Sequence, residues 1–139
     1  MAKDIFHNHV KQILIEDGWT ITHDPFLVRT KNKLSNFQID LGAEKLIAAE
    51  KDLEKIVIEV KSFLNESVTT DFHTALGQYL NYKTGLRKVG ENRTLFLAIP
   101  EEAYSELMKH EFLSASIEDY DIKLIVYSDI KPIIVLWKR

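Results

Sequence analysis

The chain has 139 residues, a length typical of one domain that builds its own hydrophobic core, so we expect a single domain over residues 1–139. Its formal net charge of −3 argues against binding polyanions through bulk charge, and the absence of cysteine excludes disulfides and thiolate chemistry. There is neither a signal-peptide pattern nor an apolar run near the roughly 20 residues that a membrane span needs. We therefore expect a cytoplasmic protein without membrane contact.

The first part of the chain predicts a helix followed by extended segments. Apolar residues recur at helical spacing over residues 5–17, and Gly18 follows as a stop signal. Residues 19–21 read as a short strand, and residues 22–38 as a loop or as a strand flanked by loops. Residues 37–50 mix strand and turn patterns.

The second part alternates strands and helices. The predicted order is a strand at 55–63, a helix at 70–87 capped by Thr69 or Thr70, a strand at 94–100, one or two helices at 101–120, and strands at 123–128 and 131–138. This alternation predicts a mixed α/β sheet with helices on its faces. Parallel neighbouring strands are expected on either side of the crossover helix.

The segment IVIEVKSF, residues 56–63, has the apolar density of a buried strand but contains an acid and a base. Because side chains alternate along a strand, Glu59 and Lys61 share the face that also carries Val57. One interpretation is a strand with one solvated face. The other is a site, because this face is not uniformly polar.

A second acid, Asp40, lies 19 residues before Glu59. An antiparallel return of residues 46–50 onto the strand would bring the start of that segment beside Glu59. Mg²⁺ prefers oxygen ligands, so the two carboxylates and the Val60 carbonyl could hold the ion. Lys61 would then orient a water or stabilise developing negative charge on a phosphate.

This pattern resembles the PD-(D/E)xK nuclease superfamily, whose restriction-endonuclease-like fold has an αβββαβ core. The matching residues are Asp40, then Glu59 and Lys61 in a strand, then Gln78 and Tyr82 in GQYLNY, which are similar to the Q-x-x-x-Y signature of RecB-like members. Ile39 stands where many members have proline. The resemblance implies a Mg²⁺- or Mn²⁺-dependent DNA endonuclease, with Gln78 and Tyr82 supporting the site.

Several segments also resemble the XisH family of fdxN element excision controlling factors. They are MAKDIFHNHVKQ, DGWTITHDP, DLGAEKLIAAE, EVKSF, FHTALGQYLNY and the ending IKLIVYS…IIVLWK, and they extend over essentially the whole chain. This resemblance implies a role in programmed excision of a DNA element, together with a site-specific recombinase and a small XisI-like partner. It does not by itself imply catalysis.

Two further side chains are candidate metal ligands, each with an ordinary alternative. His9 is the best placed histidine of the first helix, although it could simply lie on the helix surface. Glu50 could be a ligand or a charge at the end of a hairpin, and Glu44 would replace it in a different strand register.

Two basic clusters could contact DNA phosphates. Arg29, Lys31 and Lys33 lie near the expected site and are the candidate substrate-binding residues. A second cluster, Lys83, Arg87 and Lys88, ends the helix at 70–87. For any single one of these side chains, an exposed surface position is the simpler interpretation.

The sequence therefore predicts a DNA endonuclease of restriction-endonuclease-like fold, and a homodimer is compatible with it. Two rival hypotheses keep the fold without catalysis. In one, the protein is an accessory factor that binds a partner or DNA to control the recombinase. In the other, it is a purely structural interaction module.

Overall fold

The computed structural model describes the backbone of residues 2–28, 46–64 and 67–139. Within these ranges the helices and strands follow one another as α1 (Ala2–Glu16), β1 (Thr20–His23), β2 (Leu46–Lys51), β3 (Glu54–Val60), α3 (Val68–Lys88), β4 (Thr94–Pro100), α4 (Glu101–Met108), α5 (Glu111–Asp119), β5 (Leu124–Tyr127) and β6 (Ile134–Lys138). The expected order of helices and strands is confirmed, and residues 101–120 form two helices.

The strands form one six-stranded mixed sheet in the order β1-β2-β3-β4-β5-β6. β3, β4 and β5 run parallel to one another, and the outer pairs are antiparallel. The crossover through α3 explains the parallel β3–β4 pair, because a helix must return the chain to the same end of the sheet. The expected mixed α/β fold is confirmed and is consistent with a restriction-endonuclease-like fold.

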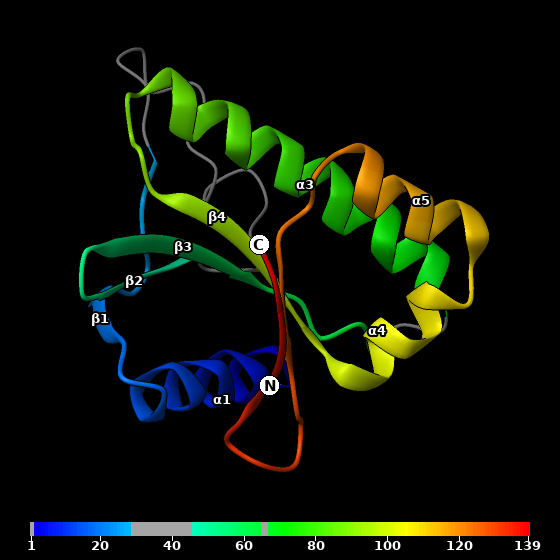
Figure 1. Ribbon diagram of the computed structural model, residues 1–139, viewed down its shortest axis with the longest axis horizontal. Coiled ribbons are helices and arrows are strands. Elements are labelled where there is room, and N and C mark those ends of the chain that lie inside the picture. The colour runs from blue at the N-terminus through cyan, green and yellow to red at the C-terminus, as the bar shows by residue number, and fades with distance from the viewer. Residues whose placement is uncertain (1, 29–45, 65–66) are drawn as a thin grey trace.

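Helices cover both faces of this sheet (Figure 1). α1 packs on one face, where Val10 and Ile13 belong to the same buried cluster as Ile56 and Ile58. α3, α4 and α5 pack on the other face, in the cluster that contains Val57. β3 is therefore a central strand with both faces buried, which explains its continuous apolar run.

The ends of β3 and α3 define the region around Lys61. β3 ends at Val60, three residues before the end of the predicted strand at 55–63, but the Lys61 amide still donates to the Ala98 carbonyl at 2.9 Å. Phe63 then has a positive φ of 56°, which is incompatible with a continued strand.

Ser67 is the N-cap of α3, so the prediction that Thr69 or Thr70 caps this helix is wrong. The Ser67 side chain accepts a hydrogen bond from the Thr70 amide at 3.2 Å. The helix begins earlier than expected because this serine satisfies one of the amides that a first helical turn leaves without a partner.

Candidate functional site

Glu59 and Lys61 form an ion pair inside the protein. Glu59 has no exposed surface, the Lys61 side chain is 11% exposed, and Lys61 Nζ lies 3.4 Å from Glu59 Oε1. Since Val57 packs against α3, the alternation along β3 places Glu59 on the α3 side of the sheet. This burial excludes the interpretation of a solvated strand face.

The pair lies at the carboxyl end of β3, which is paired with the parallel strand β4. In open α/β sheets, ligands bind outside the carboxyl ends of parallel strands. Leu46, the first residue of β2, is opposite Glu59 in the antiparallel register, which confirms the expected return of this segment. The chain that enters β2 therefore arrives at the same end of the sheet as Glu59.

The backbone of Val60 faces β2. The Lys61 amide donates to β4, and backbone groups of consecutive strand residues point to opposite neighbours. The Val60 carbonyl is therefore directed toward the side from which the chain enters β2. Asp40, the other expected carboxylate ligand, lies outside the described residues.

α3 places Gln78 and Tyr82 over the same face of the sheet. Tyr82 is buried in the cluster that contains Val57. Gln78 is half-buried, and the described residues offer its buried Oε1 no hydrogen-bond partner. Because helix side chains lean toward the helix N-terminus, Gln78 points toward the end of the sheet where Glu59 lies.

Tyr79, which is not among the candidate site residues of the sequence analysis, fixes α3 to the sheet. Its hydroxyl donates to the Leu95 carbonyl at 3.0 Å and accepts from the Lys123 amide at 3.1 Å. Burial is the main cause that raises the pKa of Tyr79 to about 12, and the negative charges of Asp121 and then Glu59 add to it. Tyr79 is therefore a neutral hydroxyl at physiological pH. No spacing rule distinguishes this tyrosine from a core aromatic residue.

The structure does not bring His9 to Glu59. The His9 Nε2 donates to the Ser128 carbonyl at 2.7 Å, and its ring packs on Tyr127. Tyr127 belongs to the buried cluster beneath α1, on the face of the sheet opposite Glu59. His9 thus anchors α1 to the end of β5.

Glu50 is also distant from Glu59. It is paired in register with Lys55, four residues before Glu59 on β3, which corresponds to about 13 Å along a strand. Its carboxylate accepts a hydrogen bond from Arg93 at 3.0 Å. Glu50 therefore holds a buried arginine at the other end of the strand.

The fit of this site to Mg²⁺ depends on the chemistry of its oxygen donors. Within the described ranges no group of three His, Asp or Glu side chains could hold a metal ion. Glu59 and the Val60 carbonyl are hard oxygen donors of the kind that Mg²⁺ prefers, and a second carboxylate is needed beside them. The candidate substrate-binding residues Arg29, Lys31 and Lys33 also lie outside the described residues.

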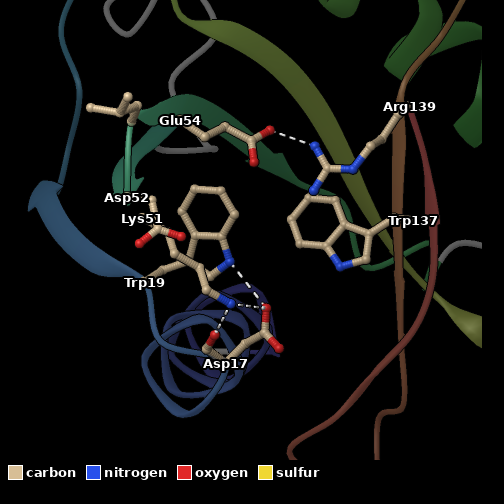
Figure 2. A pocket seen from close by; sticks show the side chains of 8 residues that line it. Asp17, Trp19, Lys51, Asp52, Glu54, Trp137 and Arg139 are labelled. Carbon is tan, nitrogen blue, oxygen red and sulfur yellow. Dashed lines mark hydrogen bonds and ion pairs between the residues drawn. The ribbon is translucent and has the colours of Figure 1, made fainter.

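A separate hollow of about 460 Å³ lies between the β2–β3 turn and the end of β6 (Figure 2). Figure 2 shows Arg139 reaching toward Glu54, with which it forms an ion pair, and its guanidinium lies 4.6 Å from the centre of the Trp137 ring. On the other side Lys51 donates to the Asp17 carbonyl at 2.6 Å. These contacts join α1 and β6 to the hairpin.

The fold and the buried pair define a class of protein. It is a mixed α/β domain in which an acid and a lysine are enclosed at the carboxyl end of the central strand. Among the described residues, no helix combines the length and the apolar composition that crossing a membrane requires.

Comparison with known proteins identifies the family. The family model described as XisH protein matches residues 1–135, so the chain belongs to the XisH family. A FdxN element excision controlling factor protein from Anabaena variabilis has a crystal structure similar to the chain, with a TM-score of 0.86 and 40% identity over 98% of this chain and 99% of that one.

A second crystal structure, of an XisH family protein from Nostoc punctiforme PCC 73102, has a TM-score of 0.86 and 38% identity over 98% of this chain and 100% of that one. None of the curated proteins compared with the chain matches it.

Proposed function

We propose that this protein is a metal-dependent DNA endonuclease of the PD-(D/E)xK superfamily that acts in the excision of a DNA element. The observation that carries the proposal is the buried pair of Glu59 and Lys61 at the carboxyl end of β3. Removing charges from water costs several kcal/mol per ion, and apolar replacements of similar volume are often more stable. A buried pair at this position therefore suggests a use other than stability.

Each residue has a distinct role in this proposal. Glu59, Asp40 and the Val60 carbonyl would hold Mg²⁺ or Mn²⁺. When bound, such an ion supplies a water of lowered pKa and neutralises charge on a phosphate. The Lys61 ammonium stabilises negative charge that develops at the phosphorus. Gln78 offers its amide to the phosphate, and Tyr82 packs beneath it.

The relatives support a DNA-related process. The relative from Anabaena variabilis is described as a FdxN element excision controlling factor protein, and it aligns with nearly the whole chain. Cleavage or strand processing during excision is compatible with that description. A site-specific recombinase and an XisI-like protein are the proposed partners, and a homodimer would let two sites cut two strands.

The second candidate function is that of a non-catalytic accessory factor for the recombinase. One observation favours it. Glu59 has no exposed surface and already contacts Lys61. In this case the pair would be a buried structural element, and binding to a protein partner or to DNA would be the activity.

The test is metal binding by calorimetry, followed by cleavage of single-stranded, duplex and branched DNA with Mg²⁺ or Mn²⁺. We expect Glu59→Gln and Asp40→Asn to abolish both, because each removes a charged ligand. Lys61→Met should retain metal binding and lower the cleavage rate by at least about 100-fold, an effect comparable with the loss of one electrostatic donor.

Glu118→Gln is the matched control, because it makes the same chemical change at an exposed position on α5. It should bind metal and cleave DNA like the wild type. If the wild type binds no metal, with or without DNA, the nuclease proposal fails and the accessory function takes its place.

A further inference from the structure

A hollow of about 440 Å³ lies at the carboxyl end of α3, away from the Glu59 site. It is formed by the last turns of α3, the segment that leads into β4, and Lys123 before β5. Thr94 at its edge is opposite Ile56, three residues before Glu59 on β3, which corresponds to about 10 Å along a strand. We name it the α3-end pocket.

The lining of the α3-end pocket is strongly basic. It contains four cationic side chains, Lys83, Arg87, Arg93 and Lys123, and one carboxylate, Glu91. This excess of positive charge stands out in a chain with a formal net charge of −3. The pocket should therefore attract anions.

Lys83 and Arg87 are the cations available for a ligand. They lie four residues apart on one face of α3, both are exposed, and no carboxylate of the described residues lies within 4.0 Å of either. By contrast, Arg93 is held by Glu50 at 3.0 Å, and Lys123 lies 3.4 Å from Asp121.

The inner wall of the pocket is apolar. Tyr79, Leu86 and Leu95 are all buried side chains of the core. Tyr79 adds no negative charge, because its hydroxyl is neutral and is already engaged with Leu95 and Lys123. Small-molecule pockets commonly combine such an apolar wall with a few polar groups and a volume of about 300–1,000 Å³.

The end of α3 does not oppose an anion as strongly as an uncapped helix end would. The Gly90 amide donates to the Arg87 carbonyl at 3.1 Å, and the Glu91 amide donates to the Leu86 carbonyl at 2.9 Å. Gly90 makes this possible with a positive φ of 77°. The last carbonyls are thus partly satisfied within the chain, so Lys83 and Arg87 remain available to bind an anionic ligand.

We propose that the α3-end pocket binds a nucleoside phosphate, with Lys83 and Arg87 on the phosphate and the base against the apolar wall. The nucleotide can belong to a DNA strand or be free in solution. The proposal goes beyond hydrolysis at Glu59 and does not require it.

The test is fluorescence anisotropy with a labelled single-stranded 12-mer and a fluorescent adenosine nucleotide, in EDTA so that no metal site contributes. We expect Lys83→Gln/Arg87→Gln to weaken binding of the probe by about tenfold or more, and to lower the salt dependence of 12-mer binding by about 0.7 per cation lost. Lys109→Gln/Lys131→Gln removes the same charge from exposed positions that do not line the pocket and should change affinity less than twofold.

Competition experiments distinguish binding to the apolar wall from attraction by positive charge alone. Adenosine monophosphate should displace the probe at a lower concentration than inorganic phosphate, and equal potency would overturn the role of the apolar wall. Equal weakening by the two double variants would show binding by general surface charge and overturn the pocket. Failure of both probes to bind would also overturn the proposal of a nucleotide-binding pocket.

Binding of the free nucleotide alone, or of the 12-mer alone, would identify the source and support the shared chemistry. Glu59→Gln should leave this binding in EDTA intact. If this variant loses cleavage but still binds the probes, the two proposals are distinguished, because the pocket then binds nucleotides independently of hydrolysis at Glu59.

Discussion

At the scale of single residues, the buried pair of Glu59 and Lys61 has a stability consequence that is independent of catalysis. Removing one partner of a buried pair leaves a charge without compensation and typically costs about 3–5 kcal/mol. We therefore expect Lys61→Met to lower the free energy of unfolding by an amount of this order. Urea denaturation at pH 7 measures it.

The double variant Glu59→Gln/Lys61→Met completes a double-mutant cycle. Because it removes both charges, it should recover most of the lost free energy of unfolding. Apolar replacements of buried pairs can even stabilise a protein by about 1–4 kcal/mol. A loss below about 1 kcal/mol for Lys61→Met alone, with additive single effects, would contradict the coupling between these two side chains.

At the scale of elements, Tyr79 is the contact by which α3 holds both β4 and the segment before β5. Tyr79→Phe removes the hydroxyl that joins the Leu95 carbonyl and the Lys123 amide. Leaving such buried groups unsatisfied costs about 1–3 kcal/mol. We expect a loss of stability in this range and faster hydrogen exchange at the Lys123 amide.

Tyr120→Phe is the control for that change, since Tyr120 is half exposed after α5. Its unfolding free energy should remain within about 0.5 kcal/mol of the wild type. Equal effects of the two substitutions would show that the hydroxyl of Tyr79 has no special role in fixing α3.

At the scale of the whole molecule, Asp24 joins the segment after β1 to α1. Its carboxylate lies 2.6 Å from Lys11 Nζ and accepts a hydrogen bond from His7 at 2.8 Å. Burial alone would raise the pKa of Asp24, but the hydrogen bonds and charges of Lys11 and His7 lower it below the ordinary value of 3.8.

Because the folded-state pKa is depressed, this carboxylate stabilises the protein above pH 3.8, and the contribution disappears as the pH falls through the lower folded-state value. We expect Asp24→Asn to destabilise the protein by roughly 1–2 kcal/mol at pH 7. The difference from the wild type should shrink below about pH 4. Urea denaturation at several pH values measures it, and a difference independent of pH would contradict this role.

Much of the fold followed from local patterns. The apolar run around Glu59, the helical pattern of residues 70–87 and the apolar strand ending at Pro100 were sufficient to predict β3, α3 and β4, and the crossover helix predicted that β3 and β4 are parallel. The cap of α3 was predicted wrongly, because Ser67, Thr69 and Thr70 are all good cap residues. Only the backbone geometry of the first turn selects one of them.

The candidate site was also only partly predictable from the sequence. The alternation of β3 determined by itself that Glu59 and Lys61 share one face, because that follows from the period of a strand. Only the tertiary structure decided that this face is buried beneath α3, that His9 lies on the opposite side, and that Glu50 is at the other end of the strand. These are distances between segments far apart in the chain, which depend on strand register and helix packing and leave no signature in local sequence.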